Sequence, residues 1–295
     1  MRPLGILNGK IVDLDDNVVP MDDRGHQFGD GVYEATKVFN GQCFGLVPHM
    51  ERLFRSLREL RIPITYTFDE LASFHELLIK ETGITESGIY LQITRGVAPR
   101  VHYFPDKIVP RLTMFLRPGS TANVPLWETG AKIILIPDER WLRCDIKSLN
   151  LLGNVLGKQR AREAGCYEAV MVRDGQITEG TSNNFFAVKD GALWTFRLSN
   201  LILKGVIRTL IIDELAPAFG LTVIEKPFGP AFVKTTDEAF LSSTLAEVMP
   251  VVSVDGMPVG NGAVGPITRK LQLAYKELLA ERCGCGKRMC SAHVG

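Results

Sequence analysis

A lysine and a pair of basic residues are the groups in this sequence that could carry out chemistry. Lys147 lies in the stretch Arg140-Trp-Leu-Arg-Cys-Asp-Ile-Lys-Ser-Leu-Asn-Leu-Leu-Gly-Asn154, between an acid-rich loop and the apolar start of a predicted helix. A lysine amine that has lost its proton can attack a carbonyl carbon. Arg100 and His102 are one residue apart, so in an extended segment both side chains point the same way and could hold a carboxylate. Alone, each would be an ordinary surface residue, because charged side chains are rarely buried.

The first part of the chain predicts a sheet covered by two helices. Asn8-Gly9 and Asn40-Gly41 lie between β-prone segments and predict hairpin turns. A helix is predicted over residues 49–61, and the capping box Thr67-Phe-Asp-Glu70 predicts the start of a second one. Alternating apolar residues predict strands over residues 88–95 and 111–117.

The second part of the chain follows a segment rich in Pro, Gly, Ser and Asn. Its predicted elements are a strand over 131–136, a helix at about 149–164, hairpins at Asp174-Gly175, Asp190-Gly191 and Asp255-Gly256, and helices near 205–218 and 266–281. We therefore expect an α+β fold of mostly antiparallel sheets with flanking helices. The predicted division is an N-terminal α/β sandwich domain (1–118), a linker (119–125), a C-terminal domain (126–282) and a Cys-rich tail (283–295).

The composition, with 45% apolar and 23% charged residues, is that of an ordinary soluble globular protein. A formal net charge of +1 offers no attraction for nucleic acid. No apolar run approaches the roughly 20 residues of a membrane helix, and no signal-peptide core is present, so we expect a cytoplasmic protein. The cysteines of the tail match no zinc-site spacing, so we expect no metal and reduced thiols.

Three stretches together resemble the core of the class IV (fold type IV) pyridoxal-phosphate-dependent aminotransferases. They are residues 140–154, Gly165-Cys-Tyr-Glu-Ala169 and Gly175-Gln-Ile-Thr-Glu-Gly-Thr-Ser-Asn-Asn184. The resemblance continues through residues 23–34, 49–53, 89–96, 203–206 and 242–250. Pro99-Arg-Val-His102 resembles the carboxylate trap of the D-amino-acid (D-alanine) aminotransferases within that family.

The resemblance implies a role for each matched residue around pyridoxal 5′-phosphate. Lys147 would be the lysine that bonds to the cofactor aldehyde and moves the substrate α-proton. Glu179 would face the pyridine nitrogen and keep it protonated, and Tyr33 would lie near the cofactor. The phosphate would be held by Arg52 and by the helix start at Gly205, Val206 and Ile207, where free amide groups meet the positive end of the helix dipole. The remaining implied cofactor contacts are Ser182, Leu203 and Thr244.

The same resemblance implies the substrate and the assembly. Arg100 and His102 would reach the active site across the interface of a homodimer, with Tyr33 of the partner subunit completing the trap. The expected reaction is ping-pong transamination of D-alanine and 2-oxoglutarate to pyruvate and D-glutamate. The alternatives are an L-branched-chain amino acid aminotransferase, a 4-amino-4-deoxychorismate lyase, and a non-catalytic binding protein or scaffold that kept the fold.

Overall fold

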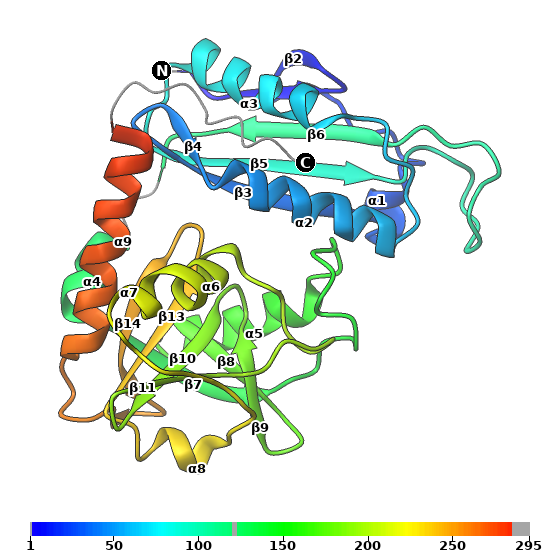
Figure 1. Cartoon of the computed structure of the whole chain (residues 1–295). Helices are drawn as coiled ribbons and strands as arrows, with labels where there is room; N and C mark the ends of the chain where they lie inside the picture. Colours follow the sequence, from blue (N-terminus) through cyan, green and yellow to red (C-terminus); the bar gives the residue numbers. More distant parts are fainter. Residues whose placement is uncertain (1, 120–122, 285–295) are drawn as a thin grey trace.

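The computed structural model describes residues 2–119 and 123–284, and within them the chain forms two β-sheets with helices packed on them (Figure 1). The first sheet has the order β2-β1-β6-β5-β3-β4, and every pair in it is antiparallel. Its strands are β1 (Leu4–Leu7), β2 (Lys10–Asp13), β3 (Gly31–Phe39), β4 (Gln42–Phe44), β5 (Ser87–Thr94) and β6 (Arg111–Leu116).

Two helices cover the first sheet, as predicted. Helix α2 (Leu46–Glu59) buries Met50, Leu53 and Leu57, each at most 1% exposed, against the apolar face of the strands. Helix α3 (Phe68–Thr82) begins at the predicted capping box, with both reciprocal bonds between Thr67 and Glu70 formed. The short helix α1 (Arg24–Phe28) precedes β3 and was not predicted.

The second sheet has the order β12-β11-β10-β13-β14-β7-β8-β9, with β15 paired to β14. Its strands are β7 (Ala131–Pro137), β8 (Glu168–Arg173), β9 (Gln176–Gly180), β10 (Asn184–Lys189), β11 (Ala192–Thr195), β12 (Val223–Glu225), β13 (Glu238–Ser243), β14 (Glu247–Val254) and β15 (Met257–Pro258). Its helical segments are α4 (Val124–Thr129), α5 (Leu152–Glu163), α6 (Val206–Leu210), η1 (Ile211–Leu215), α7 (Ala216–Ala218), α8 (Pro230–Val233) and α9 (Pro266–Gly284).

The α+β fold class and the mostly antiparallel pairing are confirmed, with parallel pairs confined to the second sheet. β7 pairs in parallel with both β8 and β14, and β11 pairs in parallel with β12. β7, α5 and β8 therefore form a strand-helix-strand crossover, which turn signals alone do not reveal. All five predicted hairpin turns form, and both residues of each turn have positive φ.

Helix α9 packs against both sheets (Figure 1). Its Tyr275 ring lies 5.6 Å from the ring of Phe44 in β4, and the carbonyl of Cys283 accepts a hydrogen bond from Asn40 at 3.1 Å. The helix includes the first two residues of the predicted tail, Cys283 and Gly284, and α4 begins within the predicted linker. Residues 120–122 of that linker and 285–295 of the tail lie outside the described residues. The domain boundaries therefore stay a prediction.

The connection between β5 and β6, residues 95–110, extends away from the first sheet and is called the β5–β6 arm below (Figure 1). No helix in the described part of the chain combines the length and the low polarity needed to cross a membrane.

Candidate active site

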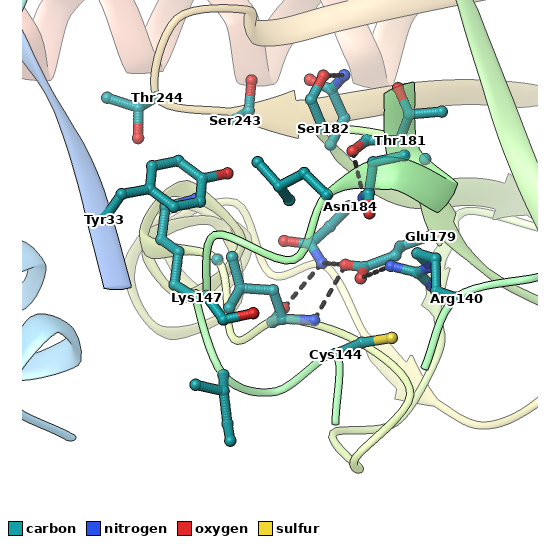
Figure 2. A pocket seen from close by; sticks show the side chains of 18 of the residues that line it. Tyr33, Arg140, Cys144, Lys147, Glu179, Thr181, Ser182, Asn184, Ser243 and Thr244 are labelled. Atoms are coloured by element: carbon teal, nitrogen blue, oxygen red, sulfur yellow. Dashed lines mark hydrogen bonds and ion pairs between the residues drawn. The ribbon is translucent and has the colours of Figure 1, made fainter. Parts of the chain in front are cut away.

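Nine of the predicted site residues line one pocket between the two sheets. Tyr33 and Arg52 come from the first sheet and helix α2, and the others come from the second half of the chain. The nine are Tyr33, Arg52, Lys147, Glu179, Ser182, Leu203, Gly205, Val206 and Thr244. Figure 2 shows Lys147 beside Tyr33, with Glu179 farther along the pocket between Asn184 and Arg140.

Lys147 is held by a backbone segment that pairs with the free edge of β3. The N–H of Tyr33 donates to the carbonyl of Lys147 at 3.0 Å, and Val32 and Ser148 form a β-bridge. The Lys147 Nζ atom lies 4.2 Å from the centre of the Tyr33 ring. Helix α5 begins at Leu152 and not near residue 149 as predicted, because Ser148 pairs with β3 and the chain turns at Leu149–Leu151, where the Leu151 N–H donates to the Leu149 carbonyl at 3.0 Å.

Glu179 is a buried carboxylate with both oxygens occupied. Its Oε1 accepts from Arg140 at 2.6 Å, and its Oε2 accepts from Asn184 Nδ2 at 2.9 Å and from the N–H of Leu203 at 3.1 Å. Burial raises the pKa of Glu179, while Arg140 and the Leu203 amide oppose the rise. Arg140 is itself bound by Asp138, so Glu179 ends a buried chain of charges.

Arg52 belongs to a second buried cluster. Its Nε and Nη2 atoms donate to the two oxygens of Glu34 at 2.7 and 2.8 Å, and its Nη1 donates to the Lys204 carbonyl at 2.9 Å. Burial alone would raise the pKa of Glu34, but Arg52 and His49 hold it well below its usual range. The fork of Arg52 toward Glu34 leaves further N–H groups of the guanidinium for the pocket.

His49 connects this cluster to Thr244. His49 Nδ1 lies 2.8 Å from Glu34 and its Nε2 lies 3.3 Å from Thr244 Oγ1. Because an ionised Glu34 can only accept, Nδ1 must carry a proton, and burial lowers the pKa of His49 toward the neutral ring. Nε2 then accepts from the Thr244 hydroxyl, so that hydroxyl keeps only its acceptor side free.

Two residues of the predicted helix start, Gly205 and Val206, line the pocket, but the third, Ile207, does not. Gly205 is the residue before α6 and, with Val206, lines the pocket, and no side chain caps the helix. Ile207 is 1% exposed and packs in the apolar core with Phe44 and Phe186, so its side chain faces away from the pocket.

Ser182 is held by a buried carboxylate that the sequence did not single out. Glu168 is 0% exposed and accepts from the hydroxyls of Thr181 and Ser182 (3.1 Å) and from Asn183 Nδ2 at 2.5 Å. The turn after β9 is thus shaped around Glu168. Arg140 and Asn184 were also missed as site residues, although both lie in the quoted motifs, because an arginine or asparagine is usually a surface residue.

Arg100 and His102 do not line this pocket. Both are exposed on the β5–β6 arm, where Arg100 Cζ lies 4.7 Å from the centre of the Phe28 ring and the His102 ring lies 5.5 Å from it. The structure therefore keeps the two predicted trap residues together on one surface but apart from Lys147 of the same chain.

Gly260-Asn-Gly-Ala-Val-Gly265 has the spacing of a dinucleotide-binding loop and precedes helix α9. Its helix start is already filled, because the N–H groups of Ile267 and Thr268 donate to the carboxylate of Glu238 at 2.9 and 2.7 Å. Glu238 therefore caps the helix that follows this loop, and the helix start is not a second binding site.

The sequence matches known proteins over most of its length. The family model described as Amino-transferase class IV matches residues 31–254. The D-alanine aminotransferase of Staphylococcus haemolyticus is 41% identical over 276 residues, which cover 94% of this chain and 98% of that protein. The D-alanine aminotransferase of Bacillus licheniformis is 40% identical over 271 residues, covering 92% and 95%.

Solved structures have the same fold. The branched-chain amino acid aminotransferase from Escherichia coli aligns with a TM-score of 0.85 and 27% identity over 94% of each chain. The branched-chain amino acid aminotransferase from Thermobaculum terrenum in its PLP form aligns with a TM-score of 0.83 and 25% identity, covering 95% of this chain and 94% of that one. The family model, the relatives and the geometry of the pocket agree, and the chain belongs to the class IV aminotransferases.

Proposed function

We propose that the protein is a pyridoxal-phosphate-dependent transaminase of D-amino acids, which converts D-alanine and 2-oxoglutarate to pyruvate and D-glutamate. The observation that carries the proposal is one pocket that holds both a half-buried lysine and a buried glutamate ion-paired to Arg140. Lys147 forms no ion pair with any other described residue, so its amine is available for chemistry. The two D-alanine aminotransferases that align with nearly the whole chain support the substrate class.

The pocket offers the groups that a phosphorylated pyridine aldehyde requires. Ser242 Oγ lines the pocket and is buried with no hydrogen-bond partner among the described residues. The amide groups at Gly205 and Val206 carry no side-chain cap, and such groups bind phosphate. In the proposal the phosphate is held by Arg52 and this helix start, where Ile207 contributes only its backbone, and Ser182, Leu203 and Thr244 complete the cofactor contacts.

The chain's own residues would supply the proton chemistry. When bound, the cofactor takes up the electron pair left at the substrate α-carbon. Lys147 Nζ would bond to the cofactor aldehyde at rest and carry the α-proton during the reaction. Glu179, held in place by Arg140 and Asn184, would hold a proton at the ring nitrogen. Tyr33 packs along the lysine and limits where its amine can point.

We further propose a homodimer in which Arg100 and His102 serve the pocket of the partner subunit. Both are exposed on the β5–β6 arm and remote from their own pocket. The outer face of α5 presents Leu152, Val155 and Leu156 at 79, 58 and 57% exposure, an apolar surface next to the pocket that a second copy would cover. A cytoplasmic location is part of the same proposal.

The test compares substrates on the purified holoprotein. D-alanine alone should bleach the near-visible absorbance of the bound cofactor, and adding 2-oxoglutarate should yield pyruvate and D-glutamate with ping-pong kinetics. Bleaching by L-leucine with no response to D-alanine would instead assign an L-branched-chain enzyme. Pyruvate release from 4-amino-4-deoxychorismate without any acceptor would assign the lyase. Turnover that survives Lys147→Ala would contradict the proposed role of Lys147 and with it the proposed reaction.

A further inference from the structure

The base of the β5–β6 arm is fixed to the segment around α1. The N–H of Arg24 donates to the Gly96 carbonyl at 2.9 Å, and the N–H of Ala98 donates to the Asp22 carbonyl at 3.1 Å. Gly96 has a φ of 112°, and a Cβ there would collide with the Val109 carbonyl on the returning strand of the arm. Where the arm leaves the sheet, its two chain segments therefore lie so close together that position 96 accommodates only glycine.

Arg24 extends this attachment to the residues of the trap. Its side chain is only 3% exposed, its Nε donates to Asp30 at 2.8 Å, and its Nη1 donates to the Val101 carbonyl at 2.6 Å. Val101 lies between Arg100 and His102. One buried guanidinium thus bonds directly to the peptide group between the two trap residues.

Arg95 attaches the arm at a second point. It is also 3% exposed, and its Nε and Nη2 donate to Asp30 at 2.7 and 3.0 Å. Its other donors reach the carbonyls of Leu60 and Arg61 at the end of α2, at 2.7 and 2.9 Å. The guanidinium lies 3.7 Å from the centre of the Phe104 ring, which belongs to the arm.

The ring of Phe28 contacts the side chains of both trap residues, Arg100 and His102. The guanidinium of Arg24 lies 4.8 Å from the centre of its ring and that of Arg100 lies 4.7 Å from it, while the His102 ring is 5.5 Å away. A guanidinium over an aromatic ring has a preferred placement, so Phe28 orients Arg100 as well as Arg24.

The network of Arg24, Arg95 and Asp30 contains two positive charges and one negative charge. Arg24 and Arg95 share the single carboxylate of Asp30, which is 12% exposed. Burying a second guanidinium is unfavourable unless its remaining donors are satisfied, and here they are satisfied by backbone carbonyls and by the Phe104 ring. A contribution to stability does not explain this arrangement, because apolar side chains packed at the same place would stabilise the fold as well.

We infer that Arg24, Asp30 and Arg95, with Phe28 and Phe104, are positioning residues that fix the β5–β6 arm so that Arg100 and His102 hold the substrate carboxylate. The inference rests on the proposed function for its substrate. Because every amino acid and oxo acid substrate carries the same carboxylate, the network should affect all of them alike. It should not affect cofactor binding, since none of these residues lines the pocket.

The first test uses Arg24→Lys and Phe104→Ala. A lysine keeps the charge but lacks the planar fork of donors with which Arg24 reaches Asp30 and the Val101 carbonyl. Phe104 is 42% exposed, so its removal spares the buried ion pairs. KM for D-alanine and for 2-oxoglutarate should both rise about tenfold with kcat nearly unchanged. Phe104→Tyr should restore KM. Arg269→Lys is the matched control, because Arg269 of α9 also donates to backbone carbonyls, those of Trp127 and Glu128 in α4, and not to the arm or to the segment around α1.

The second test asks whether Phe104 acts through Arg100 and His102. In a background that carries both Arg100→Ala and His102→Ala, Phe104→Ala should raise KM no further, because the contacts that it positions are already gone. Equal effects of Phe104→Ala with and without these two side chains would overturn the inference. So would a fall in kcat with KM unchanged.

Hydrogen exchange of residues 97–109 separates this inference from the proposed function. Amides of the arm should exchange about tenfold faster in Arg24→Lys holoenzyme than in Arg269→Lys. If the wild type transaminates no D-amino acid but this difference is seen, the anchoring stands and the substrate role falls. Unchanged exchange would refute the anchoring itself.

Discussion

Replacing Arg140 by methionine is expected to destabilise the protein by about 3–5 kcal/mol, because it leaves two buried carboxylates without their shared cation. Arg140 is 5% exposed, and it donates to Asp138 through Nε and Nη2, both at 2.9 Å, and to Glu179 through Nη1 at 2.6 Å. Asp138 would keep Arg173, at 3.0 Å, the Thr178 hydroxyl and the backbone N–H of residue 140, at 3.2 Å. Glu179 would keep only neutral partners.

The lowered pKa of Asp138 gives the same order of magnitude. Burial would raise the pKa of Asp138, but its bonds to Arg140 and Arg173 lower it to about 2 from an ordinary 3.8. A depression of this size corresponds to about 2 kcal/mol of stability at neutral pH, which is lost as the pH falls below about 4 toward 2. The unpaired Glu179 adds the remainder of the expected effect.

Urea unfolding at neutral pH measures this difference. The matched control is Arg160→Met, since Arg160 is 45% exposed and pairs with Glu139 at the surface, a pair worth less than about 1 kcal/mol. Arg140→Lys should fall between the two, because an ammonium keeps the charge but lacks the planar fork that makes two bonds to Asp138 and one to Glu179. Equal unfolding midpoints for Arg140→Met and Arg160→Met would refute the reasoning that this buried cation holds Glu179 in place.

Two further predictions concern a buried histidine and a glycine. Burial lowers the pKa of His75 from 6.5 to about 4, so the unfolded chain binds the proton more tightly and stability falls as the pH drops from about 6.5 to 4. His75→Leu should therefore lose about 2 kcal/mol less than the wild type between pH 7 and pH 5 in urea unfolding, whereas the exposed His26→Leu should behave as the wild type does. Gly205→Ala should speed cofactor loss on dialysis about tenfold, because its Cβ would collide with Asn184 Oδ1. Retention equal to that of Gly284→Ala, where the nearest atom to an added Cβ is Ala280 Cβ at 4.0 Å, would contradict this.

Local chemistry made much of the fold predictable. The Asn-Gly and Asp-Gly pairs accept positive φ at both turn positions, so their hairpins follow from residue type alone. The Thr67 capping box likewise fixes the start of α3. The extended pairing of Ser148 with Val32 could not be predicted, because the partner strand is more than 100 residues away in the sequence and overrides the helical pattern of residues 149–151.

The site was predictable only where the family motif fixes a residue's task. Lys147, Glu179 and Tyr33 meet in one pocket, as the resemblance implied, although their roles remain proposals. Arg140 was missed because its partners, Asp138 and Glu179, come together only after the second sheet folds. The anchoring of the β5–β6 arm was not predicted either, because Asp30 and Arg95 are brought together only by the pairing of β3 with β5 in the first sheet.

The identity of the lysine that bonds to the cofactor tests the central claim most directly. Borohydride reduction of the native holoprotein makes that bond permanent, and peptide mapping by mass spectrometry then locates the label. The account predicts one pyridoxyl group per chain, on Lys147 in the pocket beside Tyr33. A label on another lysine, or none, would contradict it.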